Sequence, residues 1–362
     1  MDVTLDKTGT RFQPLHFDWE DEPQTRAVRQ VKGLRMGRIT VGTCPAARLV
    51  DRATLEMDVS IIVPTRNRRE LLATTLRSAL RQRDIDFEVI VVDEASTDET
   101  PAMLAAVGDA RVRVIRHDTP RGLPAARNHG AADARGDWLA FLDDDDLWAS
   151  DKLVRQLRAA EQAGRDWVYT GSVNILGGRI THAGRPLPPE ETVATLPRYN
   201  AIPGGGSNVI WRRTTWRQVG PFDTRFQGGE DWDMSIRLAK HGPPAWVCSP
   251  LMAKRVHSTN MFLDVTKIVR ATKLIEVLHH TQADWGKHHR WFAQVYLRSG
   301  RYRAALGQFA RAAGRGQLGG VVSDLSAILQ RRLGRNQQRE LADNPWRAAA
   351  KAWLREFDDG IQ

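Results

Sequence analysis

The stretch Val59-Ser-Ile-Ile-Val-Pro-Thr-Arg-Asn67 decides the fold class of this 362-residue chain. Its first five residues are an apolar run rich in β-branched side chains, which is typical of a strand buried on both faces of a sheet. Pro64 should end this strand, because proline has no N–H to donate to a neighbouring strand. Polar residues follow at once. This pattern predicts the first strand of a parallel α/β sheet.

The chain then alternates between helix and strand at short intervals. Segments with helical apolar spacing cover residues 70–81, 124–135 and 151–163, and short apolar runs cover 87–92, 112–115 and 138–142. Ser96-Thr-Asp-Glu99 has the pattern of a capping box, which would open a further helix. Strand, helix and strand in series with short links predict a Rossmann-like, mostly parallel sheet flanked by helices.

Three regions follow from this pattern. Residues 1–56 contain three prolines and one short strand signal, and we expect a small β element packed on the main domain. Residues 57–262 form the predicted α/β domain, and residues 263–362 form a predicted basic helical region. Within the α/β domain, the proline-rich segment 184–206 is too long for a simple connection, so we expect it to bind a substrate.

The charge is concentrated at one end of the chain. The formal net charge is +10, and residues 262–362 hold 17 Lys/Arg against 9 Asp/Glu. Such a region suits an anionic lipid, an acidic acceptor or nucleic acid, although a solvated helical surface is the simpler interpretation, and we do not expect a nucleic-acid partner.

The composition also indicates where the protein works. Two distant cysteines argue against a disulfide scaffold or a zinc cage and fit a reducing cytoplasm. The N-terminus lacks the pattern of a signal peptide, and no apolar run approaches the roughly 18 residues of a spanning helix. We therefore expect a cytoplasmic protein whose membrane contact, if it has any, is peripheral at the inner face.

Four consecutive carboxylates, Asp143 to Asp146, follow the strand predicted at 138–142. Adjacent carboxylates raise each other's pKa unless a cation offsets their charge, and oxygen ligands select Mg²⁺ or Mn²⁺ over zinc. In an extended segment, residues two apart point the same way, so Asp143 and Asp145 should share a site while Asp144 and Asp146 face elsewhere. Capping of the next helix would explain one aspartate but not four.

The order of the motifs resembles the inverting family 2 glycosyltransferases, which have the GT-A fold. The resemblance runs from Val59 to about His257, a little over half of the chain. It rests on five segments in the family's order: Val59 to Asn67, Val91-Val-Asp-Glu-Ala-Ser-Thr-Asp98, Gly122-Leu-Pro-Ala-Ala-Arg-Asn-His-Gly130, Phe141-Leu-Asp-Asp-Asp-Asp146 and Gly229-Glu-Asp-Trp232.

The resemblance implies a nucleotide site at the ends of the first two strands. Three residues would shape the pocket: Pro64, Thr65 and Asn67. Asp93 would accept a hydrogen bond from the base, which fits the N–H donor of a uracil ring. The family often has a second aspartate where Glu94 stands. Arg127, and Arg121 with it, would face the base or the diphosphate, since arginine suits phosphate.

The resemblance also implies a metal site and a catalytic base. Asp145 would be the direct ligand of Mn²⁺ or Mg²⁺, Asp143 would lie nearer the ribose or a metal-bound water, and His257 would complete the site. Asp144 belongs with the residues expected to bind the nucleotide sugar.

Asp231 would take the proton of the acceptor, which gives in-line displacement with inversion. Its neighbours Glu230 and Trp232 would contact the acceptor or the sugar.

Three other classes of function share some of these features. A nucleotidyltransferase would more often have a Gly-rich phosphate loop after the first strand, and a glycoside hydrolase needs no nucleotide pocket. A degenerate GT-A fold acting only as a nucleotide- or polyanion-binding module is the remaining alternative. A UDP-sugar is the favoured donor, with GDP- and dTDP-sugars left open. The acceptor stays open among a glycan, a lipid-linked sugar, a secondary metabolite and a peptide.

Overall fold

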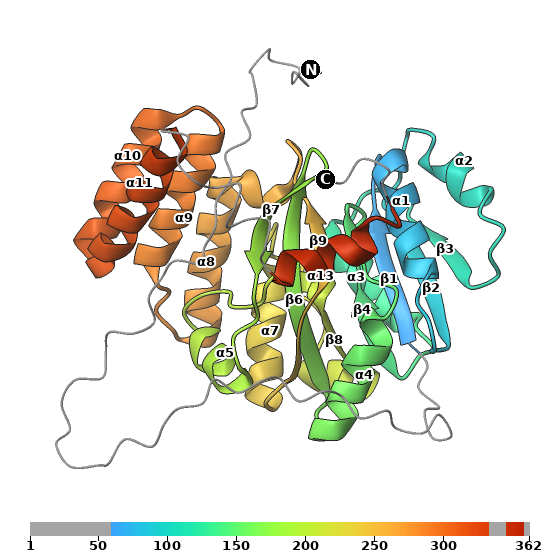
Figure 1. Cartoon of the computed structure of the whole chain (residues 1–362). Helices are drawn as coiled ribbons and strands as arrows, with labels where there is room; N and C mark the ends of the chain where they lie inside the picture. The colour runs from blue at the N-terminus through green and yellow to red at the C-terminus, as the bar shows by residue number, and fades with distance from the viewer. Residues whose placement is uncertain (1–58, 333–344, 358–362) are drawn as a thin grey trace.

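The computed structural model describes residues 59–332 and 345–357, so the β element predicted within residues 1–56 lies outside the described residues. A nine-stranded sheet with helices on both faces forms the centre of the molecule (Figure 1). The strand order is β3-β2-β1-β4-β8-β6-β9-β5, and β7 pairs with β6. This arrangement confirms the predicted α/β class.

The first half of the sheet is parallel. Its strands are β1 (Val59–Thr65), β2 (Phe87–Asp93), β3 (Val112–Arg116) and β4 (Trp138–Phe141), with β1 paired to both β2 and β4. The connecting helices are α1 (Arg69–Leu80), α2 (Thr100–Ala105) and α3 (Leu123–Ala132). Because all four strands run the same way, their carboxyl ends meet at one edge of the sheet.

The second half of the sheet is mixed. Its strands are β5 (Asp146–Trp148), β6 (Trp167–Leu176), β7 (Arg179–Gly184), β8 (Val209–Arg212) and β9 (Ala245–Arg255). Strands β6 and β9 are parallel, and the pairs β4–β8, β6–β8, β6–β7 and β5–β9 are antiparallel. Four helices and one 3₁₀ turn connect these strands: α4 (Lys152–Ala163), α5 (Pro189–Thr195), η2 (Gly205–Asn208), α6 (Arg213–Val219) and α7 (Glu230–His241).

Apolar side chains pack on both faces of the sheet, as the unbroken apolar runs predict. In β1, Ile61 joins one buried cluster with Leu72 of α1, whereas Ile62 joins another with Ala126 of α3. Burial on both faces fixes the strand register, because a shift of one residue would exchange the two sets of side chains.

The chain leaves the sheet after η3 (Met261–Leu263) and forms a helical unit. This unit consists of α8 (Val265–His279), α9 (Trp285–Arg298), α10 (Tyr302–Ala312), the kinked segment η4 (Ala313–Gln317) and α11 (Leu318–Arg332). Its helices stand side by side at one end of the molecule (Figure 1). No helix within the described ranges combines the length and the apolarity that a bilayer crossing needs.

The last helix, α13 (Pro345–Leu354), does not belong to this unit. Trp346, Ala350 and Leu354 join a buried cluster with Val173 of β6 and Ile180 of β7. Residues 345–354 are helical, as predicted for the region 263–362, but this helix packs on the central sheet and not on α8 to α11.

Two local predictions are wrong. Pro64 lies inside β1, because the pairing of β1 with β4 stops at Ile62 and no hydrogen bond from residue 64 is needed there. Ser96 does not cap a helix. Its hydroxyl accepts a hydrogen bond from the Asn67 backbone N–H at 2.9 Å, and α2 begins only at Thr100.

Candidate active site

The carboxyl ends of β1 and β2 form one continuous polar edge. Asn67 has a positive φ of 53°, which asparagine tolerates better than most residues. Its side-chain oxygen accepts a hydrogen bond from the Thr97 backbone N–H at 2.7 Å. Together with the bond from Asn67 to Ser96, this contact ties the two loops into the wall of the predicted nucleotide pocket.

Asp93 lies under this wall. Its carboxylate is 1% exposed, accepts a hydrogen bond from the Ser96 backbone N–H at 2.9 Å and forms an ion pair with Arg116 at the end of β3. Glu94 accepts hydrogen bonds from the backbone N–H groups of Arg121 and Gly122 and is paired with His117. The glutamate that departs from the family pattern therefore fixes the loop that leads into α3.

Asp143 to Asp146 form a turn rather than an extended strand. The Asp146 N–H donates to the Asp143 carbonyl oxygen at 3.0 Å, and carboxylate oxygens of Asp143, Asp145 and Asp146 lie within 4.8 Å of one another. The prediction that Asp146 faces away is wrong, because a turn brings its first and fourth residues to the same side. Asp144 does point elsewhere, since its carboxylate accepts a hydrogen bond from the Thr65 hydroxyl at 2.8 Å.

An arginine that the sequence analysis did not single out reaches this turn from the start of α1. The Arg68 guanidinium lies 2.7 Å from an Asp145 oxygen and 3.0 Å from an Asp144 oxygen. Burial raises the pKa of Asp144 to about 6, although the Arg68 charge acts in the opposite direction. The position of Arg68 directly after Asn67, at the mouth of a parallel sheet, was the signal that could have found it.

His257 contacts Asp145, as the resemblance implies. Its Nε2 lies 2.9 Å from Asp145 Oδ2, and the Asn260 side-chain amide donates to the same oxygen at 3.1 Å. Burial opposes ionisation of Asp145, but the hydrogen bond from His257 and the charge of Arg68 outweigh it and lower the pKa to about 2. Asp145 is therefore a carboxylate at neutral pH.

Arg127 links the aspartate turn to α7. The family resemblance implies that this side chain faces the base or the diphosphate. In the structure it is 1% exposed, and its guanidinium is held between Asp143 and Glu230, 2.7 Å from Glu230 Oε1. Burial raises the pKa of Glu230 to about 7, with the charge of Arg127 acting to lower it and that of Asp231 to raise it.

Asp231 and Glu230 are adjacent in α7 but occupy different environments. Glu230 is 3% exposed and engaged by Arg127, whereas Asp231 is only half-buried. A Cβ added to Gly205 would lie 2.4 Å from Asp231 Oδ2, so the glycine-rich end of the segment 184–206 lies directly against this carboxylate. This contact brings together two features that the sequence analysis predicted separately.

Trp232 does not offer the expected surface to a sugar. It is 4% exposed, its indole N–H donates to the Leu196 carbonyl at 2.6 Å, and its ring stacks on His288 with 5.5 Å between centroids. The prediction is wrong because this position of α7 faces the core. The acidic motif at the start of α7 does not indicate whether the tryptophan that follows it points to the core or to the solvent.

The three clustered carboxylates suit a divalent cation. Both oxygens of Asp146 are buried, and the charge of the buried Lys254 acts on this carboxylate. Oxygen donors from three aspartates, with the His257 imidazole beside one of them, are a ligand set that Mn²⁺ and Mg²⁺ accept. The residues present therefore fit the predicted metal.

Comparison with known proteins decides the family. The glycosyl transferase family 2 model matches residues 60–214. A PGL/p-HBAD biosynthesis glycosyltransferase of Mycobacterium bovis is 34% identical over 182 residues, which cover 49% of this chain and 68% of that protein. The chain belongs to glycosyl transferase family 2. Succinoglycan biosynthesis protein ExoO of Rhizobium meliloti is 37% identical over 157 residues, but the match spans only 43% of this chain and 44% of that protein.

Two solved structures of glycosyltransferases share the fold of this family member. TarS 1-349 of S. aureus, in complex with UDP-GlcNAc, gives a TM-score of 0.51 at 18% identity and covers 71% of this chain and 81% of its own. The mannosyltransferase PcManGT of Pyrobaculum calidifontis, in complex with GDP-Man and Mn²⁺, gives 0.50 at 19% identity and covers 84% and 88%. At these identities the similarity establishes the GT-A fold.

Proposed function

We propose that this protein transfers a sugar from a nucleoside diphosphate donor, most simply a UDP-sugar, to an acceptor with inversion at the anomeric carbon. One observation carries the proposal. Arg127 joins Asp143 of the aspartate turn to Glu230, the neighbour of Asp231, so one buried side chain connects the two groups of acids that sugar transfer needs.

The donor would lie along the edge formed by β1, β2 and the aspartate turn. Asn67 is exposed beside the buried Asp93, and a carboxylate in that place suits the N–H of a base. The bound UDP-GlcNAc of TarS and GDP-Man of PcManGT, both proteins of the same fold, support a nucleotide-sugar donor.

Asp143, Asp145 and Asp146 would hold Mn²⁺ or Mg²⁺, which would supply neutralisation of the charge that builds on the departing nucleoside diphosphate. The Mn²⁺ of PcManGT supports a divalent ion. Arg68 would move from Asp145 toward the phosphates, since its side chain is 26% exposed and can turn outward. Arg127 would stay in place and hold Asp143 in position.

Asp231 would accept the proton of the acceptor hydroxyl. A general base needs access to its substrate, and Asp231 is half-buried where Glu230 is enclosed. Gly205 would leave the space above the carboxylate open, because any side chain there would meet it. The segment that ends at Gly205 would then contribute to acceptor binding.

Calorimetric titration of UDP, GDP and dTDP into the purified protein, with and without Mn²⁺, tests the donor site. We expect metal-dependent binding of one nucleotide. Asp231→Asn should keep that binding while transfer falls by about 10²–10⁴-fold, the usual contribution of a general base. Glu191→Gln removes an exposed carboxylate of α5 and serves as the control. Near-normal turnover by Asp231→Asn would show that another group is the base.

The same titration separates this proposal from the degenerate binding module. A module that binds only polyanions through its basic helical unit would take up none of the three nucleotides, although the protein is folded. Metal-dependent binding of a nucleotide without transfer to any acceptor tested would leave a nucleotide-binding module as the better description.

A further inference from the structure

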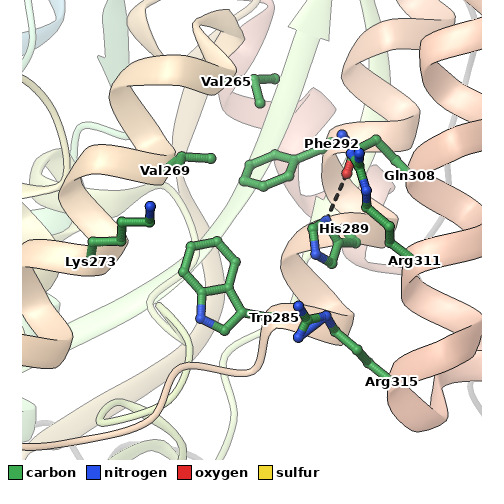
Figure 2. Close-up of a pocket in the computed structure, with 9 residues that line it drawn as sticks. All are labelled: Val265, Val269, Lys273, Trp285, His289, Phe292, Gln308, Arg311 and Arg315. Atoms are coloured by element: carbon green, nitrogen blue, oxygen red, sulfur yellow. Dashed lines mark hydrogen bonds between the residues drawn. The ribbon is translucent and has the colours of Figure 1, made fainter.

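The helical unit contains a pocket whose lining residues have no role in the proposed sugar transfer. It has a volume of about 270 Å³ and lies between α8, α9 and α10. Figure 2 shows that side chains from these helices and from η4 converge on it. The lining residues are Val265, Val269, Lys273, Trp285, His289, Phe292, Gln308, Arg311 and Arg315.

The pocket combines apolar walls with three cationic groups. Val265, Val269, Trp285 and Phe292 supply carbon surface, and the Trp285 ring is held in place by a hydrogen bond from its N–H to Glu276 at 2.8 Å. The cations are Lys273, Arg311 and Arg315. None of them has a carboxylate partner within residues 59–332 and 345–357.

The charges of this unit explain why the cations stay unpaired. Residues 265–329 contain ten Lys/Arg and only three acids: Glu276, Asp284 and Asp324. Each acid already accepts hydrogen bonds inside the unit, Asp284 from the backbone of α9 and Asp324 from the buried Arg290 at 3.0 Å. Asp324 is offset by Arg290, and Glu276 and Asp284 keep their negative charge, so residues 265–329 still carry an excess of positive charge.

The charges of both arginines act on His289, which lines the same pocket. Burial lowers the pKa of His289, and the charges of Arg315 and Arg311 lower it further, against a hydrogen bond with Gln308. That bond joins His289 Nδ1 to Gln308 Oε1 at 2.7 Å and is drawn in Figure 2. A bound anion would relieve the repulsion among these groups.

We propose that this pocket binds the phosphate head of a membrane lipid. Arg311 and Arg315, which lie on the same side of the pocket in Figure 2, would contact the phosphate, and the first carbons of the chain would lie on Val265, Val269 and Phe292. A nucleotide fits less well, because its base would need neutral hydrogen-bonding groups. Apart from the Trp285 indole, the lining residues of that kind are His289 and Gln308, and these two are already bonded to each other.

A second observation favours a lipid over a soluble phosphate. Helix α11 carries an apolar stripe of Leu318, Val322, Leu325 and Leu329, which are between 43% and 62% exposed. Their spacing of four and three residues places them on one face of the helix. Exposed apolar residues on a unit with an excess of positive charge are typical of a surface that rests on an anionic bilayer. This site is separate from sugar transfer and does not depend on it.

Calorimetry with dodecyl phosphate below its critical micelle concentration tests the pocket in the full chain at low salt. We expect binding that weakens as salt is added and that falls about tenfold or more in Arg311→Gln/Arg315→Gln, which removes two charge-assisted contacts. Arg303→Gln removes an exposed arginine of the same helix outside the pocket and should bind as the wild type does.

Val269→Asp should also abolish binding, because it places a negative charge in the apolar wall. Val277→Asp is its control, since Val277 is on the same helix, 69% exposed and outside the pocket. Both changes should leave the calorimetric titration with nucleotides unchanged, which keeps this test independent of the donor site.

The source of the phosphate is tested with two further probes. Inorganic phosphate that binds as tightly as dodecyl phosphate would overturn the proposal in favour of a soluble anion, and uncharged dodecyl maltoside that binds as tightly would reduce the site to an apolar groove. Vesicles of phosphatidylcholine with phosphatidylglycerol should sediment with the wild-type chain more than with Arg311→Gln/Arg315→Gln. Equal sedimentation of the two proteins would count against a lipid ligand.

Discussion

Replacing Arg127 by methionine tests the link between the two groups of acids. Methionine fills similar space without a charge, so the change removes the contacts to Asp143 and Glu230 and keeps most of the packing against Phe222, whose ring centroid lies 5.3 Å from the guanidinium carbon. The arginine is 1% exposed, so solvent cannot replace the lost partners.

The expected loss of stability follows from the burial of both partners. Breaking a buried ion pair by removing one side costs about 3–5 kcal/mol, because the other charge stays behind without compensation. Glu230 can take a proton instead, which limits its share of the cost at neutral pH. Asp143 keeps 27% of its side-chain surface and retains water contacts. We therefore expect about 3 kcal/mol, near the lower end of that range.

Urea unfolding of wild-type and Arg127→Met protein at neutral pH measures this loss. Arg121→Met is the matched control, because Arg121 is an exposed arginine on the loop just before the same helix and should cost less than about 0.5 kcal/mol. In the Arg127→Met background, Glu230→Gln should recover part of the stability. A loss for Arg127→Met below about 1 kcal/mol, or no recovery in the double variant, would refute the buried pair as the link.

Three further predictions concern the same site. Arg68→Gln should tighten Mn²⁺ binding roughly threefold to tenfold, because Arg68 is paired with Asp145, a predicted metal ligand. Titration with Mn²⁺ measures this, with the exposed Arg69→Gln as the control. Weaker binding by Arg68→Gln would mean that Arg68 supports the metal site. Gly205→Ala should lose roughly 1 kcal/mol of stability, because its φ of 65° disfavours a side chain, and at least about tenfold in kcat, because its Cβ would displace Asp231. Gly164→Ala, at a φ of 61° with no atom within 4 Å, should lose similar stability and keep full turnover; equal rates for the two variants would show that the close approach of Gly205 to Asp231 has no part in the mechanism. Glu230→Gln should gain stability relative to wild type as pH rises from about 4.5 to about 7. In the wild type, the folded Glu230 carboxyl has a raised pKa and keeps a proton that the unfolded chain releases, so the wild type loses stability over this range. If urea unfolding gave the same difference between the two proteins at every pH, Glu230 would not have a raised pKa.

The helices and strands around the site could be predicted from local patterns. The strands β1 and β2 are buried on both faces of the sheet. Such a strand is an unbroken apolar run, because its side chains on either face must be apolar, and this run is visible in the sequence. The aspartate cluster was also readable, because four adjacent carboxylates at the end of a strand have few structural explanations.

Side-chain direction within those motifs could not be read in the same way. The prediction assumed that residues 143–146 are extended. A backbone hydrogen bond from Asp146 to Asp143 folds them into a turn instead, and the turn brings the Asp146 carboxylate into the cluster. Trp232 became a core residue because α8 and α9 pack over α7, and neither helix is near Trp232 in the sequence.

The sequence alone determined the fold class and the residue types at the site, because a strand or a helix imposes a local spacing on its own residues. The family followed from the order of the motifs and from comparison with known proteins. Only the tertiary structure decided which charges meet. The sequence analysis did not single out Arg68 or Arg116, and it expected Arg127 to face the donor, yet each of the three lies against an aspartate, 77, 23 and 16 residues away respectively. Such pairings arise from how the strand ends converge at one edge of the sheet, and no pattern along the chain records that convergence.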